Sequence, residues 1–371
     1  MKIGVTGANG FIGSHLTRTI KLLNNFPIIP FERYFFSDEK KLDQFVNQCD
    51  IIFHLAGVNR HENSKVLFQT NIQLAEKLSD SIKKSKSKPY VIYASSTQEN
   101  ENNDYGKSKY LAGEIIKKCA KDNNLKFKKI LIPNVYGPFS KPFYNTVVAT
   151  FINQHFNDKK TKIENDKKLC LIYVDDLIDV LLSLLNSDDN RKNVLVPTNL
   201  TTSILVSDLD SLIENITTKY KKGEIINCQS KLERNLLNMI ICQIDYESFF
   251  PFKLVSHKDS RGSFSEVIRA YGGGQVSFST TEPGITRGNH FHTRKIERFC
   301  VIKGSASIKF RKVDEEKVFE FNVSGENPSV IDMPIWHTHL IENTGNDELV
   351  TLFWISEHYD ESNGDTYFNN V

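Results

Sequence analysis

The chain has 371 residues, with 47 basic and 45 acidic side chains and a net charge of +2, so it lacks the strong charge expected of a protein that binds nucleic acid or anionic lipid. Apolar residues make up 39% of the sequence, which suffices for folded cores, and the length predicts two or three domains of about 100 to 200 residues. The longest aliphatic stretch, Leu177 to Leu185, contains Asp179 and Ser183 and is far shorter than the roughly 18 apolar residues of a membrane span. We therefore expect no membrane insertion.

The amino terminus and the cysteines predict a cytoplasmic protein. Residues 1–7 lead directly into an apolar strand and a glycine turn, without the features of a secretory signal. The six cysteines are widely spaced and contain no CxxC pair, which favours reduced thiols over a disulfide scaffold.

Short apolar runs alternate with helical patterns in the first 240 or so residues. This alternation predicts parallel βαβ units and a doubly wound sheet of the Rossmann type. The expected strands are Lys2–Thr6, Ile28–Phe31, Ile51–Leu55, Tyr90–Ser95 and Phe127–Ile132.

From about Phe250 onward the pattern changes to short β-rich segments with frequent turn signals. Long amphipathic helices disappear, which predicts a β-barrel or sandwich. We place the two domains at 1–246 and 247–371. The expected strands of the second are Phe264–Arg269, Gln275–Ser279, Phe299–Ile302, Ala306–Arg311, Val318–Val323, Val330–Met333 and Leu349–Ile355.

A glycine turn follows the first expected strand. Gly7, Gly10 and Gly13 have the spacing GxxGxxG and open a helical pattern. Glycines permit a tight turn and let backbone N–H groups approach a pyrophosphate at the positive end of the helix. The position directly after the first strand of a βαβ series favours this interpretation over a turn that binds no ligand.

The end of the second strand bears on the choice between NADPH and NADH. Glu32 favours a ribose hydroxyl and therefore NAD, whereas the Arg33 guanidinium matches the 2′-phosphate of NADP. We favour NADPH, with a solvent-exposed Arg33 as the alternative.

Tyr105 and Lys109 are four residues apart, so on a helix they share one face. A lysine ammonium beside a phenol stabilises the phenolate and is expected to lower its pKa toward neutrality, which suits proton exchange with an alcohol or carbonyl. Ser95, Ser96 and Thr97 end an apolar strand nearby and offer a hydroxyl for the same carbonyl.

Together these motifs resemble the extended short-chain dehydrogenase/reductase family over roughly residues 1–240. The resemblance implies that Tyr105 is the general acid, that Lys109 lowers its pKa and holds the nicotinamide ribose, and that Ser96 binds the substrate oxygen, with Thr97 as a competitor. Leu131 departs from the arginine of many relatives. The implied cofactor-binding residues are Gly7, Gly10, Phe11, Ile12, Gly13, Arg33, Leu55, Ala56 and Lys109, and further matches are His54, Gly57, Asn71, Pro133–Gly137 and Tyr173–Asp176.

A second cluster of chemical groups lies near the carboxyl terminus. His290 and His292 point to the same face of a strand because side chains alternate with period two, and Glu297 is expected to return on the neighbouring strand. His339 completes a site of three nitrogens and one oxygen, with His337 as the alternative. Zinc is our first choice, and nickel, manganese or iron would accept the same ligands.

This cluster resembles the cupin motifs. Gly284, His290, His292, Glu297 and Gly304 fit the first motif, whereas in the second Trp336 occupies the usual glycine position. The segments 259–266 and 275–290 are similar to cupin-type epimerases of nucleotide-linked 4-keto-6-deoxyhexoses, although those use the histidine at the position of His290 as a base and hold no metal. Asp259, Arg261 and Glu266 are either substrate contacts or a solvated turn.

A reductase followed by an epimerase-like cupin resembles bifunctional enzymes of capsule biosynthesis. The resemblance implies a homodimer that acts on a UDP-linked 4-keto-6-deoxy-N-acetylhexosamine. Its cupin domain would epimerise carbon 3, and its reductase domain would reduce the 4-ketone with NADPH, giving UDP-2-acetamido-2,6-dideoxy-β-L-talose. Two alternatives remain: a nucleotide-sugar dehydratase or epimerase whose cupin only dimerises the chain, and a nucleotide sensor without turnover.

Overall fold

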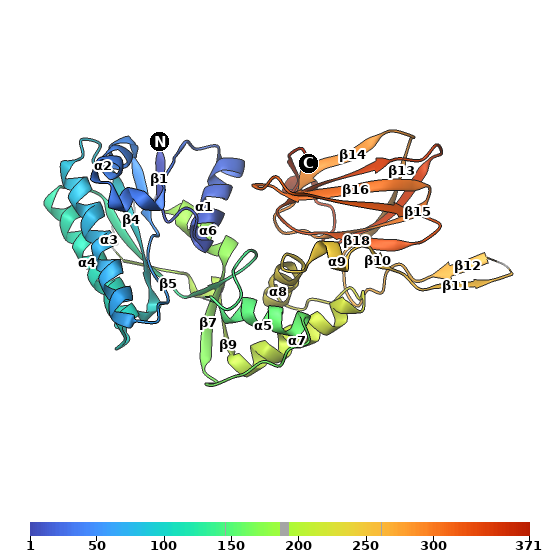
Figure 1. Cartoon of the computed structure of the whole chain (residues 1–371), viewed down its shortest axis with the longest axis horizontal. Helices are drawn as coiled ribbons and strands as arrows, with labels where there is room; N and C mark the ends of the chain where they lie inside the picture. The colour runs from blue at the N-terminus through green and yellow to red at the C-terminus, as the bar shows by residue number, and fades with distance from the viewer. Residues whose placement is uncertain (145, 186–192, 261) are drawn as a thin grey trace. The chain divides into compact units, whose positions relative to one another are not determined.

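The computed structural model describes residues 1–144, 146–185, 193–260 and 262–371 (Figure 1). The chain forms two compact units. The first contains Met1–Thr150 and Ile163–Asp208, and the second contains Phe151–Lys162 and Leu209–Val371. Residues 209–246, which the sequence prediction assigned to the first domain, therefore pack with the second unit.

A parallel sheet of six strands forms the centre of the first unit, in the order β2-β1-β3-β4-β5-β8. The order reverses between β1 and β3, and ligands of doubly wound folds bind at such a switch point. The predicted Rossmann-type sheet is confirmed. Its strands are β1 (Ile3–Thr6), β2 (Ile28–Ile29), β3 (Ile51–His54), β4 (Tyr90–Ser96), β5 (Phe127–Ile132) and β8 (Asn193–Leu195).

Helices cover both faces of this sheet (Figure 1). Apolar side chains of α1 (Phe11–Thr19) and α6 (Val174–Ser183) pack on one face. Those of α2 (Glu39–Gln48), α3 (Ser64–Lys84) and α4 (Asp104–Asp122) pack on the other. The first unit also contains a small sheet of β6 (Asn134–Tyr136), β7 (Lys168–Tyr173) and β9 (Thr201–Leu205), whereas α5 (Val147–Phe156) begins in the first unit and continues into the second.

Two antiparallel five-stranded sheets build the β part of the second unit, which confirms the predicted all-β fold (Figure 1). The first sheet has the order β10-β18-β15-β20-β13, with β10 (Phe252–Lys253), β18 (Ser329–Met333), β15 (Glu297–Lys303), β20 (Leu349–Ile355) and β13 (Gln275–Thr281). The second has the order β17-β16-β19-β14-β21, with β17 (Val318–Ser324), β16 (Ser305–Lys312), β19 (His337–Asn343), β14 (Thr286–Phe291) and β21 (Tyr367–Phe368).

Two predicted strands end at least two residues earlier in the structure than expected. β2 ends at Ile29 because Pro30, which has no N–H to donate, follows it. The segment predicted as Phe264–Arg269 is strand only up to Ser265, in the hairpin of β11 (Ser256–Asp259) and β12 (Gly262–Ser265).

Three helices of the second unit, α7 (Val206–Lys221), α8 (Lys231–Ile241) and α9 (Tyr246–Phe249), precede its sheets. Arg298 of β15 forms a buried ion pair with Asp332 of β18, at 2.6 Å. The Tyr220 hydroxyl of α7 donates to Asp332 at 2.8 Å, and Arg298 donates to the Gly223 carbonyl. These contacts explain why residues 209–246 pack with the cupin strands.

The buried ion pair gives a stability prediction. Asp332→Ala leaves the Arg298 charge buried without its partner, so we expect a loss of about 3–5 kcal/mol in the free energy of unfolding. Urea titration followed by circular dichroism measures it. The matched control is Glu348→Ala, which removes a partly exposed partner of Lys303 and should cost less than about 1 kcal/mol. Equal losses for the two variants would contradict the assignment.

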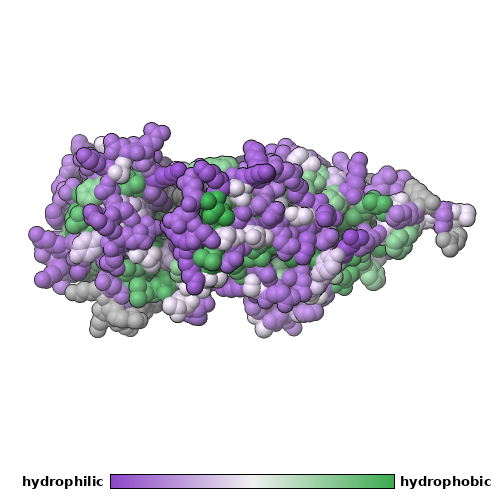
Figure 2. All heavy atoms as spheres, turned by 90° about the horizontal axis from the view of Figure 1, so that it is seen from below, coloured by the Kyte–Doolittle hydropathy of each residue, from purple (hydrophilic) through white to green (hydrophobic). Residues whose placement is uncertain are grey.

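The surface is rich in hydrophilic residues, as expected for a chain in which 25% of the residues are charged (Figure 2). The face in Figure 2 is largely hydrophilic, with hydrophobic residues in small groups. Among the described residues, no helix has the length and apolar character needed to cross a membrane.

Candidate active site and metal centre

The glycine turn has the geometry of a phosphate cradle. Gly7 has φ +77°, and a Cβ on it would lie 2.9 Å from the backbone nitrogen of Ala56. A Cβ on Gly13 would lie 2.1 Å from the Gly7 carbonyl oxygen. Helix α1 begins at Phe11, and no side chain caps its first N–H groups. The close backbone approach at Gly7 and Gly13, which only glycine allows, together with the uncapped helix start, fits a turn that binds a dinucleotide pyrophosphate.

Two of the other predicted cofactor residues, Leu55 and Ala56, lie against this turn. Leu55 and Ala56 follow β3 at the switch point, and the Ala56 N–H donates to the Thr6 hydroxyl at 3.4 Å. Phe11 and Ile12 are half-buried against the core. Arg33 is exposed and lines a pocket, which is also lined by Glu32, Ser37 and Lys77.

The turn gives a second prediction. Gly13→Ala should weaken NADPH binding at least about tenfold and lower the melting temperature, because the added methyl group overlaps the Gly7 carbonyl oxygen. Fluorescence titration with NADPH and thermal unfolding measure both effects. Gly273→Ala is the matched control, since its Cβ would meet nothing within 4 Å. Wild-type affinity in Gly13→Ala would refute the cradle.

Tyr105, Ser96 and Lys109 come together at the carboxyl end of the sheet. Tyr105 lies in the first turn of α4, Ser96 ends β4, and a hydrogen bond joins their side chains. Thr97 is exposed, so of the two candidate hydroxyls it is Ser96 that faces Tyr105. Lys109 is buried one turn further along α4, with its Nζ atom 4.8 Å from the centre of the Tyr93 ring.

The electrostatics of this group differ from the sequence-based expectation. Burial raises the pKa of Tyr105, and the hydrogen bond to Ser96 only partly opposes the rise. Burial lowers the pKa of Lys109 to about 8, against the opposing charge of Glu99. Desolvation therefore dominates, and the net shift of the Tyr105 pKa is opposite to the predicted lowering. A raised pKa keeps the phenol protonated and suits a proton donor.

Two further groups support this site. Asn71 of α3 is buried; its side chain accepts from the Val58 N–H at 2.7 Å and donates to the Ser108 hydroxyl at 2.9 Å, so it ties the loop after β3 to α4. The sequence prediction missed Glu99, whose carboxylate accepts from Ser95 at 2.6 Å and from the buried Lys129 at 2.9 Å. The only sequence signal was Lys129 itself, a charge inside an apolar strand.

His290, His292, Glu297 and His339 converge between the two cupin sheets. One potential ligand atom from each residue lies within 4.8 Å of the others. His290 of β14 pairs directly with His339 of β19. Glu297 Oε2 lies 3.1 Å from His339 Nε2 and 3.5 Å from His292 Nε2.

The structure corrects the expected position of Glu297, decides between His339 and His337, and explains Trp336 at the glycine position. Glu297 lies on β15, which belongs to the opposite sheet and not to a neighbour of β14, so the cluster bridges the sandwich. His337 lies outside the cluster: its ring packs on Tyr246 at 5.5 Å, and its Nδ1 bonds the Ile335 carbonyl. Trp336 has φ +58°, the left-handed conformation that glycine favours at this motif position.

The donor set fits a divalent cation. Burial and then the neighbouring His339 lower the pKa of His290 to about 4, so its imidazole is neutral at pH 7. Burial alone would raise the pKa of Glu297, but the nearby imidazoles of His292 and His339 hold it below its usual range. The buried Nε2 atoms of His292 and His339 and the Oε2 atom of Glu297 have no hydrogen-bond partner. Imidazoles and a carboxylate are among the ligands that bind zinc in proteins.

The possible substrate contacts near the hairpin are not gathered into this cluster. Glu266 is exposed and forms an ion pair with Arg269, as expected for a solvated turn. Asp259 is exposed on β11, and Arg261 lies outside the described residues.

Fold and site together define a nicotinamide-dependent reductase-type unit joined to a cupin-like unit with a candidate metal site. Residues 3–196 match the NAD dependent epimerase/dehydratase family, and residues 257–367 match the polysaccharide biosynthesis C-terminal domain. The chain belongs to the NAD dependent epimerase/dehydratase family and carries this second domain.

Two relatives are similar over the whole chain. A UDP-2-acetamido-2,6-beta-L-arabino-hexul-4-ose reductase of Pseudomonas aeruginosa is 33% identical over 100% of this chain and 99% of its own length. The crystal structure of the capsular polysaccharide assembling protein CapF from Staphylococcus aureus is 29% identical, with a TM-score of 0.64 and coverage of 100% of both chains. UDP-glucose 4-epimerase of Thermotoga maritima shares the fold of 65% of this chain, at 21% identity and a TM-score of 0.54.

Proposed function

We propose that the chain is a bifunctional nucleotide-sugar enzyme. Its cupin domain, 247–371, epimerises carbon 3 of a UDP-2-acetamido-2,6-dideoxy-4-keto-hexose. Its reductase domain, 1–246, then reduces the 4-ketone with NADPH to UDP-2-acetamido-2,6-dideoxy-β-L-talose. The observation that carries the proposal is the occurrence in one chain of a Tyr105–Ser96–Lys109 group beside a dinucleotide cradle and of a buried three-histidine, one-glutamate cluster.

The order of the two steps follows from carbonyl chemistry. A proton on the carbon beside a ketone is acidic because the negative charge left behind spreads onto the carbonyl oxygen. Reduction of the ketone removes this stabilisation. Epimerisation must therefore precede reduction, and this dependence gives a reason for joining both activities in one chain.

In the reduction step the chain's own residues position and protonate the ketone. NADPH, when bound at the glycine cradle, supplies the hydride. Ser96 donates a hydrogen bond to the ketone oxygen, and Tyr105 gives it a proton. Lys109 holds the nicotinamide ribose, and its positive charge stabilises the tyrosinate left after the transfer. Arg33 and Lys77, which line one pocket, favour the 2′-phosphate of NADPH over the hydroxyl of NADH.

In the cupin domain, His290, His292, Glu297 and His339 would hold zinc. A divalent cation at this position supplies either Lewis-acid stabilisation of a developing oxyanion or structural support between the two sheets. Because His290 serves as a ligand in this arrangement, a different group acts as the base of the epimerisation.

The protein is also proposed to act in the cytoplasm as a homodimer. The six described cysteines are all free thiols, in keeping with a reducing compartment. The edge strand β13 exposes Val276 and Phe278, 55% and 70% accessible, which a second copy could cover.

Turnover of the UDP-linked 4-keto-6-deoxy-N-acetylhexosamine with NADPH in deuterated water tests the proposal. We expect oxidation of NADPH and a product that carries deuterium at carbon 3, detected by NMR. A product made without consumption of NADPH would favour the dehydratase or epimerase alternative. No reaction with either nicotinamide coenzyme would refute the proposal.

A further inference from the structure

Part of the last twelve residues, 360–371, pairs with β14, the strand that carries His290 and directly precedes His292. β21 pairs antiparallel with β14, so that Phe368 lies opposite His290 and Tyr367 opposite Phe291. The Asn369 N–H donates to the Asn289 carbonyl at 3.0 Å. The end of the chain thus forms the edge of the sheet that holds the cluster.

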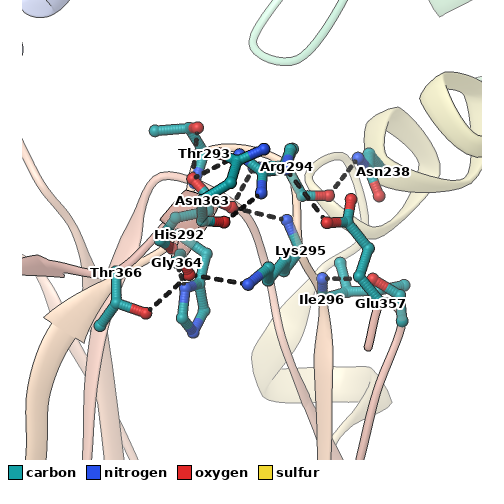
Figure 3. A network of polar contacts seen from close by, with 12 residues as sticks. Asn238, His292, Thr293, Arg294, Lys295, Ile296, Glu357, Asn363, Gly364 and Thr366 are labelled. Atoms are coloured by element: carbon teal, nitrogen blue, oxygen red, sulfur yellow. Dashed lines mark hydrogen bonds and ion pairs between the residues drawn. The ribbon is translucent and has the colours of Figure 1, made fainter. Parts of the chain in front are cut away.

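Asp365 is the centre of the polar contacts of this segment. Its side chain is fully buried, and its carboxylate accepts the backbone N–H groups of Thr293 at 3.0 Å, Arg294 at 3.0 Å and Lys295 at 3.1 Å. It also accepts the Thr293 hydroxyl at 2.7 Å. All four donors belong to the loop that directly follows His292, and Figure 3 shows Thr293, Arg294 and Lys295 of this loop beside Asn363 and Gly364. Asp365 thereby fixes the backbone next to a candidate ligand.

The main chain of Asp365 contacts the ligand itself. Its carbonyl oxygen is hydrogen-bonded to His292 Nδ1. A carbonyl oxygen can only accept, so the bond requires a proton on Nδ1. The lone pair of the neutral ring is then on Nε2, the atom that faces Glu297 and has no hydrogen-bond partner. In metal-binding histidines, the hydrogen-bond partner of the ring nitrogen that does not bind the metal sets the tautomer and the orientation of the ring.

Further hydrogen bonds hold the loop after His292 and the residues that precede Asp365 in place (Figure 3). Lys295 Nζ donates to the Gly364 carbonyl at 2.7 Å, and the Arg294 guanidinium donates to the Asn363 carbonyl at 2.7 Å. On the far side of the loop, the Asn238 amide of α8 donates to the Arg294 carbonyl at 3.2 Å. The pairing of β21 with β14 would be enough to attach the segment to the sheet. These hydrogen bonds, in contrast, all hold the loop after His292.

We propose that Asp365 is a positioning residue of the metal site: its carboxylate, bonded to the loop 293–295, holds its own carbonyl against His292 Nδ1 and thereby fixes the tautomer of that ring. The inference rests on the proposed metal site. Although Asp365 is no ligand, metal affinity should depend on it. Loss of an outer partner of a metal-binding histidine typically weakens metal binding by about 10- to 100-fold.

The test compares the full-length protein with Asp365→Ala, Asp365→Asn and the matched control Asp360→Ala, which changes an exposed aspartate of the same segment. Competition with a chromophoric chelator gives the Zn²⁺ affinity, and the visible spectrum of the Co²⁺-loaded protein reports ligand geometry. We expect about 10- to 100-fold weaker Zn²⁺ binding and an altered Co²⁺ spectrum in Asp365→Ala. Asp365→Asn, which keeps one oxygen acceptor, should bind with intermediate affinity, and Asp360→Ala should match the wild type.

Each outcome decides the inference. Wild-type affinity and spectrum in both Asp365 variants, with circular dichroism unchanged, would overturn the positioning role while leaving the metal site intact. If Asp365→Ala does not fold, Asp365→Asn decides by the same two measurements. A wild-type protein that binds neither Zn²⁺ nor Co²⁺ would overturn the proposed metal site, and the positioning role with it.

Discussion

Tyr105→Phe is expected to lower the rate of NADPH oxidation by about 10²- to 10⁴-fold, which is the usual contribution of a general acid. The variant removes only the hydroxyl that is hydrogen-bonded to Ser96 and leaves the aromatic ring in the first turn of α4. Exchange of the carbon 3 proton with deuterated solvent should continue at the wild-type rate, because we assign it to the cupin domain. Absorbance of NADPH and NMR of the recovered keto-sugar measure the two reactions separately.

The matched control for this variant is Tyr110→Phe. Tyr110 lies on the same helix and is 45% exposed, so loss of its hydroxyl should leave both reactions unchanged. If Tyr105→Phe abolished both reduction and exchange, the division of labour between the two domains would be wrong. If it retained full reductase activity, another group would be the acid.

The parts of the fold that could be predicted are those with a local signal. Apolar runs separated by helical patterns predicted five strands of the parallel sheet, and Phe127–Ile132 has the predicted bounds. Local patterns also predicted strands of the cupin sandwich, and Leu349–Ile355 has its predicted bounds. The predicted bounds were wrong for short strands in which a single residue sets the end. The side chains of residues 28–31 suit a strand, but Pro30 has no N–H to donate and so β2 ends before it.

Long-range contacts limit what could be predicted of the sites. His290 and His292 share a short motif, whereas the sheet to which Glu297 belongs depends on pairings with β18 and β20 far along the chain. Desolvation also has no local signal: the Tyr105–Lys109 spacing predicted a lowered phenol pKa, but burial raises it. Asp365 lies 73 residues after His292, and nothing in its neighbourhood suggests a role at a metal site.

Among the metal ligands, His339 gives the sharpest test because the sequence left His337 as an alternative. His339→Ala removes an Nε2 atom that lies 3.1 Å from the Glu297 carboxylate. We expect its Zn²⁺ affinity to fall by more than about 100-fold, since loss of a ligand should exceed the 10- to 100-fold cost of losing an outer partner. Metal content by mass spectrometry and chelator competition measure the change.

His337→Ala is the matched control, because both histidines are buried on β19 and the two variants lose the same volume. The His337 ring packs on Tyr246 and Phe310, so its loss should lower the free energy of unfolding by roughly 0.5–3 kcal/mol. Its bound metal should nevertheless stay at the wild-type level. Full metal binding in His339→Ala together with loss in His337→Ala would reverse the ligand assignment, and equal loss in both would mean that packing of β19, rather than either imidazole, controls the metal content.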